Sequence, residues 1–294
     1  MRYSGVFKLI IVLMFPVNVN ALVVASEKCE VRYPQKSHEM YTIASYPAVI
    51  LAEALIATEQ EFGKCDLVYI GNYSLKRQVN SLVSNDGVDI AWLPATKEFS
   101  EQLLHISIPV RKGLLGWRIL LVNEVSAKKL SNVKTLNELN EFTAGYSSNW
   151  SDFPVMQKNF DKLVTSPNYE TLFKMLAYER FDFFSRALYE APEELNYHKS
   201  EHPNLLIEPT IALHYKQIDL FYVNKSNTRL HERVTKGLLL MLEDGRFDKI
   251  FNHYYKKYID QSELSSRTII QLESPNMPVD SLFEDARLWI DPTQ

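Results

Sequence analysis

The chain has 294 residues, a formal net charge of −4 and 46% hydrophobic residues. This length allows one large domain or two ordinary ones, and the hydrophobic fraction is typical of a globular protein. Balanced charge argues against nucleic acid as a partner. The 9 glycines form neither a GxGxxG nor a Walker loop. This absence disfavours folds that cradle nucleotide phosphates.

The amino terminus has the pattern of a secretory signal peptide. Arg2 and Lys8 flank the start of an apolar stretch, and small residues follow it up to Ala21 and Ala25. The stretch is too short for a bilayer of about 30 Å, so the pattern predicts export rather than a membrane span. We expect residues 1–25 to be removed, with cleavage after Ala21 or Ala25 left open. A buried N-terminal helix is the alternative.

Cys29 and Cys65 are the only two cysteines, and both follow the predicted cleavage site. An oxidising compartment favours a disulfide between them, with two buried free thiols as the alternative. Each cysteine opens a predicted strand of one βαβ unit. Because parallel neighbours start at the same edge, the two sulfur atoms can lie close together.

Predicted strands and helices alternate along the chain, which favours an α/β class with parallel strands. Pro34 is expected to end the first strand, and Gly63 the first helix. The expected strands are 29–34, 65–71, 87–94, 106–110, 115–123, 142–148, 162–166, 180–186, 204–209 and 218–225. The expected helices are 47–62, 74–86, 127–140, two beginning at 150 and 169, 191–200, and one long helix over 228–255. The tail, 261–294, has no clear period.

Motifs for catalysis are missing: the chain has no HExxH, GxSxG, CxxC or EF-hand pattern. We therefore expect no enzyme activity, no cofactor and no metal site. His198 and His202 have a spacing compatible with a metal, but no third ligand is evident. A solvated helix face is the preferred interpretation of this pair.

Candidate ligand-binding residues follow predicted strands, because open parallel sheets bind ligands at the carboxyl ends of their strands. This rule selects Tyr33, Trp92, Tyr146, Trp150 and Arg186. Ordinary packing is the alternative for each aromatic residue. Arg186 comes directly after an apolar strand, where an unpaired charge is costly, so it either pairs with a carboxylate such as Glu190 or meets an anionic ligand.

The loop of residues 145–152 is a second candidate site. Ser147, Ser148 and Asn149 would supply hydroxyl groups, an amide and backbone N–H groups at the start of the predicted helix at Trp150. A helix N-terminus attracts anions and polar acceptors. A well-capped helix without a ligand is the equally open alternative.

The order of these elements resembles bacterial periplasmic solute-binding proteins of the amino-acid-binding (family 3) type, in a stand-alone subgroup. The resemblance covers essentially the whole chain after the signal peptide. It rests on the blocks CEVRYP, RQVNSLVSNDGVDIAWLP, HISIPVRKGLLGWRILLVN, YETLFKMLAYERFDFFSR, WSD and LESPNMP. It implies a two-lobed type 2 periplasmic binding fold with mostly parallel sheets, flanking helices and two crossover segments. The implied lobes are 26–116 with 215–294, and 117–214.

Two positions depart from the family. Phe99 stands where the family's T-x-E-R element has the arginine that binds an α-carboxylate, and Ala187 stands where an aspartate would bind the α-amino group. An ordinary α-amino acid is therefore not the expected ligand. Arg111 and Arg186, with the aromatic residues and the serine loop, would instead form a pocket for an anionic or aromatic solute.

The resemblance implies a periplasmic monomer that captures a small solute in the cleft between its lobes, for transport with an ABC permease. The alternative function is a ligand-sensing module for a membrane receptor, and a further one is an enzyme on the same fold. Neither nucleic acid nor a membrane span is expected. The fold by itself does not decide among these functions.

Overall fold

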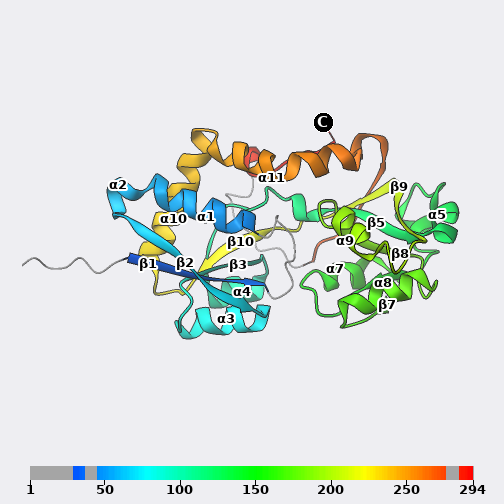
Figure 1. The fold of residues 1–294 in the computed structure, drawn as a ribbon, viewed down its shortest axis with the longest axis horizontal. Helices are drawn as coiled ribbons and strands as arrows, with labels where there is room; N and C mark the ends of the chain where they lie inside the picture. The colour runs from blue at the N-terminus through cyan, green and yellow to red at the C-terminus, as the bar shows by residue number, and fades with distance from the viewer. Residues whose placement is uncertain (1–28, 37–44, 276–284, 294) are drawn as a thin grey trace, which may run out of the picture.

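The computed structural model describes residues 29–36, 45–275 and 285–293 (Figure 1). The predicted signal peptide lies outside this part of the chain. The α/β class is confirmed, and the strands gather at two separate places. Strands β1 to β4 and β10 lie at one end of the molecule, and β5 to β9 lie at the other.

The disulfide of the first lobe is confirmed. Strands β1 (Cys29–Lys36) and β2 (Cys65–Tyr73) are parallel, and Cys29 and Cys65 are register partners with their Cα atoms 4.6 Å apart. The predicted end of β1 at Pro34 is wrong. Because proline has no N–H to donate, the register shifts between Tyr33 and Gln35, and the strand continues beyond the proline.

Three antiparallel strands complete this lobe, in the order β3 (Ile90–Pro94), β10 (Asp219–Val223) and β4 (Leu104–Ile106). Strand β1 lies beside β3, since the backbone N–H of Asp89 donates to the carbonyl of Arg32 over 2.9 Å. The helices of the lobe are α1 (Tyr46–Ala57), α2 (Glu59–Phe62), α3 (Leu75–Ser84), α4 (Lys97–Gln102) and α10 (Thr228–Glu243).

The second lobe contains a six-stranded sheet, and the chain enters it from the first lobe through the third strand in spatial order. Its order is β11 (Thr268–Gln271), β9 (Leu205–His214), β5 (Trp117–Asn123), β8 (Phe183–Ala187), β6 (Ala144–Tyr146) and β7 (Leu163–Thr165). Strand β5 is antiparallel to both neighbours, whereas β6 is parallel to β7 and β8. The helices are α5 (Glu124–Leu130), α6 (Leu136–Leu139), α7 (Phe153–Asn159), α8 (Tyr169–Ala177) and α9 (Ala191–His198).

Several predicted helices have different bounds in the structure, and the one predicted over 47–62 is divided at Thr58 into α1 and α2. The helix predicted over 127–140 is two helices, because Thr135 and Glu138 form a capping box that starts α6 anew. The long helix predicted over 228–255 breaks at Gly245, whose φ of 78° lies in the left-handed region. The chain continues from there as α11 (Arg246–Ser262). The helix predicted at Trp150 begins only at Phe153.

The tail contains a strand that sequence periodicity does not predict. Strand β11 pairs in parallel with β9, so a segment expected in the first lobe extends the sheet of the second. The chain reaches it through α11, where the Tyr258 hydroxyl donates to Glu193 of α9 over 2.6 Å. Further on, the Ile290 N–H donates to the Lys112 carbonyl over 3.0 Å. The carboxyl-terminal part therefore contacts both lobes and a crossover segment.

Short 3-10 helices lie at Leu114–Gly116, Leu264–Ser266 and Ala286–Leu288. Within the described residues, no helix combines the length and the apolar character that crossing a membrane requires.

Candidate functional site

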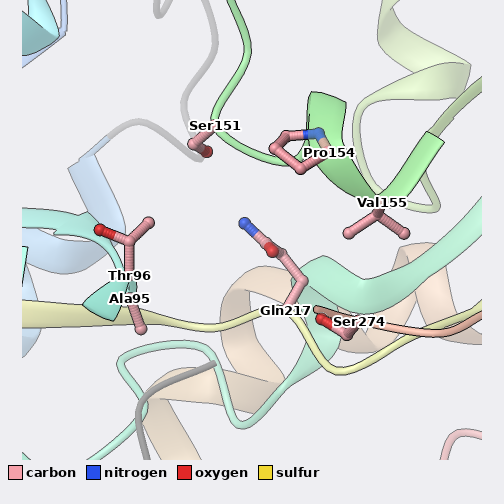
Figure 2. Close-up of a pocket in the computed structure, with 7 residues that line it drawn as sticks. All are labelled: Ala95, Thr96, Ser151, Pro154, Val155, Gln217 and Ser274. Carbon is pink, nitrogen blue, oxygen red and sulfur yellow. The ribbon is translucent and has the colours of Figure 1, made fainter. Parts of the chain in front are cut away.

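A small hollow, partly open to solvent, lies where the two lobes meet (Figure 2). Its walls come from four separate segments of the chain. The lining residues are Ala95 and Thr96 after β3, Ser151, Pro154 and Val155 around the start of α7, Gln217 between β9 and β10, and Ser274 after β11. The hollow therefore takes residues from both lobes and from the second crossover segment.

Local sequence holds the two facing walls in place. Strand β3 ends at Pro94, and the Thr96 side chain caps α4 by accepting a hydrogen bond from the Phe99 N–H over 3.2 Å. On the other wall, Pro154 lies in the first turn of α7, a position at which proline's missing N–H costs nothing. Both walls are thus fixed by the start of a helix.

Gln217 is the polar side chain that extends farthest into this space, between Thr96 and Pro154 (Figure 2). Its residue is only 7% exposed. Within the described part of the chain, its side-chain amide makes no hydrogen bond. The amide is not closed off from solvent, so its two donor hydrogens and its acceptor oxygen are available to water or to a solute. Gln217 is therefore the group best placed to bind a solute in the hollow.

Asp152 organises a buried polar network directly behind Ser151. Its Oδ2 atom accepts hydrogen bonds from the hydroxyls of Tyr146, over 2.7 Å, and Tyr215, over 2.8 Å, and it forms an ion pair with Arg118. Burial and the negative charge of Asp152 raise the pKa of Tyr146. These residues connect β6, the crossover segment and β5, so the network joins the second lobe to its hinge.

Arg186 is only 8% exposed and is paired with two carboxylates. Its Nε and Nη2 atoms donate to the two oxygens of Glu194 over 2.7 and 2.6 Å, and Nη2 lies 2.9 Å from Glu190. Burial alone would lower the pKa of Arg186, but Glu190 and Glu194 raise it well above its usual value. Of the two alternatives given by the sequence, the structure contains the carboxylate pair.

Trp150 covers the other side of this guanidinium group, whose carbon lies 4.2 Å from the ring centroid. The ring also stacks on Phe184 at 5.7 Å. In the same loop Ser147 is buried and its hydroxyl accepts from the Asn149 N–H, whereas Ser148 is exposed. Because α7 begins at Phe153, neither serine lies at the predicted helix N-terminus.

The candidate residues of the first lobe and hinge contact other side chains, but the buried Nε1 atom of Trp92 has no hydrogen-bond partner among the described residues. Trp92 is buried, and the half-buried Tyr33 packs on it with ring centroids 5.7 Å apart. Burial raises the pKa of Tyr33, and Tyr69 raises it further. Arg111 forms a buried ion pair with Asp219 and donates to the Tyr255 hydroxyl over 2.9 Å.

None of the eight candidate ligand-binding residues is in the lining of the hollow. Tyr146 and Arg186 lie in the polar network around the hollow's second-lobe wall, and their role in binding stays a prediction. Sequence reasoning did not single out Ser151, Gln217 or Ser274. Ser151 nevertheless lies in the loop of residues 145–152 that was predicted as a candidate site, and Ser274 lies in the block LESPNMP. Thr96 could have been found, because it comes just after β3 at the carboxyl end of a strand.

The two positions that depart from the amino-acid-binding family have no charged role here. Phe99 packs edge-on against Tyr222 with centroids 6.4 Å apart, and Ala187 is fully buried in β8. Neither can bind a carboxylate or an amino group.

A second, shallow hollow lies between α8 and α9 and is lined by both predicted histidines. The predicted solvated face is wrong for His198, which is 3% exposed and stacks on Phe173 at 3.8 Å. Burial lowers the pKa of His198. Among the described residues, no group of three His, Cys, Asp or Glu side chains could hold a metal ion.

No protein-family model matches the chain, and no curated protein is similar to it in sequence. Solved structures are similar in fold. An amino acid ABC transporter substrate-binding protein from Streptococcus pneumoniae, bound to L-arginine, has a TM-score of 0.52 at 17% identity, covering 79% of this chain and 95% of its own. An ancestral arginine-binding protein bound to glutamine has a TM-score of 0.53 at 16% identity, covering 78% and 98%.

A histidine kinase sensor domain with similarity to periplasmic binding proteins also matches, with a TM-score of 0.53 at 14% identity, covering 78% of this chain and 96% of that domain. At these identities the likeness establishes the fold alone. The chain has the two-lobed type 2 periplasmic binding fold, which confirms the fold implied by the sequence.

Proposed function

We propose that this protein is a periplasmic solute-binding protein that captures a small molecule between its lobes and delivers it to an ABC permease. The main support for this proposal is the hollow, because two lobes and a crossover segment supply its walls and the Gln217 amide extends into it. Clefts at domain junctions are the usual place for small-molecule sites. Closure of the lobes around a bound solute would be a hinge motion.

The export signal predicted from the sequence and the disulfide between β1 and β2 support a periplasmic location, because disulfides persist in oxidising compartments. We propose that the protein acts as a monomer and catalyses no reaction. A sensing role at a membrane receptor is the second candidate, and the similarity to a histidine kinase sensor domain favours it. Both roles require the same solute-binding step.

The anionic or aromatic solute expected from the sequence has unequal support. Tyr33, Trp92 and Trp150 offer aromatic faces, but these are packed on other side chains. The two arginines expected to meet an anion, Arg111 and Arg186, are both ion-paired within the protein.

Filling the hollow tests the proposal. Ser151 is half-buried in a loop, so Ser151→Trp can place an indole in the hollow without disturbing either sheet. We expect this variant to keep its fold and to bind solutes at least about tenfold more weakly, because its ring occupies the solute's space. Thermal-shift screening of a metabolite library, followed by titration calorimetry, measures the difference.

Ser131→Trp, at an exposed position after α5, is the matched control and should bind like the parent. Equal affinity in Ser151→Trp and the parent would move the binding site away from this hollow.

A further inference from the structure

The chemistry of the hollow is neutral. Its polar groups are the hydroxyls of Thr96, Ser151 and Ser274 and the amide of Gln217, and the other lining residues are alanine, proline and valine. None of these side chains carries a charge near neutral pH. Among the residues that the structure describes, a solute in this space therefore meets hydrogen-bonding groups and apolar surface, but no charged side chain in the lining.

The charged groups behind the second-lobe wall form a closed network. Arg118 pairs with Asp152 and lies 3.6 Å from Glu190, and Arg186 pairs with Glu190 and Glu194. Two guanidinium groups are thus shared among three carboxylates, which leaves the network with one excess negative charge. Each arginine is also more than nine-tenths buried. To bind an anion, an arginine would have to leave a carboxylate that is itself buried, which is costly.

Of the hinge cations next to the hollow, Arg111 is paired within the protein, and the exposed Lys216 beside Gln217 is not one of the lining residues. Arg111 is buried against Asp219 and donates to Tyr255, so its charge is neutralised inside the crossover segments. A carboxylate or phosphate entering the hollow would lose its hydration and gain no compensating charge from these arginines. It would also be repelled by the excess negative charge of the network.

We infer that this cleft selects an uncharged polar solute, one that carries hydroxyl or amide groups, and discriminates against carboxylates and phosphates. The inference rests on the proposed solute-binding function. An amide such as that of Gln217 has two donor hydrogens and one acceptor oxygen, so it can pair with a hydroxyl or with another amide. A site built to hydrogen-bond such a group discriminates strongly, since a wrong solute leaves the amide unpaired.

Matched pairs of neutral and anionic probes test the inference. The pairs are glucose with glucuronate, nicotinamide with nicotinate, and uridine with uridine monophosphate. Each is titrated by calorimetry into the disulfide-bonded mature protein. We expect any probe that binds to be the neutral member of its pair, with its anionic counterpart at least about tenfold weaker. An anionic member that binds as tightly as its neutral counterpart would overturn the inference and leave solute binding itself intact.

Variants of Gln217 test whether its amide group is responsible for the preference for neutral solutes. Gln217→Met keeps the length of the side chain but removes the amide, and Gln217→Glu adds a negative charge; both should weaken the neutral probe at least about tenfold. Gln102→Met, at an exposed position on α4, makes the same chemical change away from the hollow and should have no effect. Unchanged affinity in a folded Gln217→Met variant would contradict the role given to the amide.

A protein that binds none of these probes is examined for a co-purified solute, whose charge is read from its mass and ionisation after release. An uncharged solute supports the inference and an anionic one overturns it. A protein with neither a bound probe nor a co-purified solute would contradict the proposed function itself.

Discussion

Asp152 shows how much of the candidate site depends on a single buried side chain. One carboxylate oxygen accepts hydrogen bonds from two tyrosine hydroxyls and pairs with one guanidinium group. These partners come from β5, β6 and the crossover segment. Removing its charge leaves Arg118 buried with only the more distant Glu190. A buried charge that loses its partner is among the costliest changes in a protein.

We therefore expect Asp152→Asn to lower the free energy of unfolding by about 3 kcal/mol. Urea denaturation followed by circular dichroism measures this loss. Asp260→Asn, in the exposed pair of Lys256 and Asp260 on α11, should cost less than about 1 kcal/mol. Similar losses in the two variants would show that the Asp152 network contributes little to stability.

For Arg186, the sequence indicated that the charge requires a partner, but it did not identify every carboxylate that pairs with it. The position of Arg186 after an apolar strand indicated that its charge must be met, and Glu190 was a named candidate. Glu194, which forms the bidentate pair with Arg186, could not be singled out, because several acidic residues follow the strand. Gln217 had no signal at all, since its burial depends on segments that are far apart in the sequence.

Secondary-structure elements were predicted well in order and less well in their ends. Apolar spacing selects the strands and helices, but the breaks depend on local backbone chemistry. Pro34 does not end β1, because a register shift accommodates it. Gly245 separates α10 from α11 inside one continuous amphipathic pattern. The pattern continues because both helices bury apolar faces, so the break leaves no trace in the periodicity.

Two glycines of this region should respond differently to alanine. In Gly245→Ala the new Cβ meets no atom within 4 Å, so only its φ of 78° opposes the change, at a cost of about 1 kcal/mol. In Gly237→Ala the Cβ would lie 2.2 Å from the Ala54 carbonyl oxygen, which forces α10 away from α1. Overpacking of this kind costs about 1–3 kcal/mol, enough to exceed the gain in helix propensity.

Thermal unfolding of both variants shows which of the two alanine substitutions destabilises the protein more. A Gly237→Ala variant more stable than the parent would show that α1 and α10 are not packed at this distance.

For the whole molecule, the two-lobed fold could be expected from element order and family resemblance, but the course of the tail could not. Strand β11 joins the second-lobe sheet, and Ser274 just beyond it lines the hollow. Ser274 reaches the hollow because α11 crosses between the lobes. Sequence periodicity does not predict such a long-range arrangement. The candidate site is therefore a property of the assembled lobes rather than of any one motif.

Solute capture between the lobes can be measured by native mass spectrometry of freshly purified mature protein and of its Ser151→Trp variant. We expect the parent to carry one small molecule of a single mass, released on denaturation, and the variant to carry much less of it. Equal occupancy in both proteins, or a parent that neither carries a solute nor acquires one from a metabolite library, would contradict solute capture between the lobes.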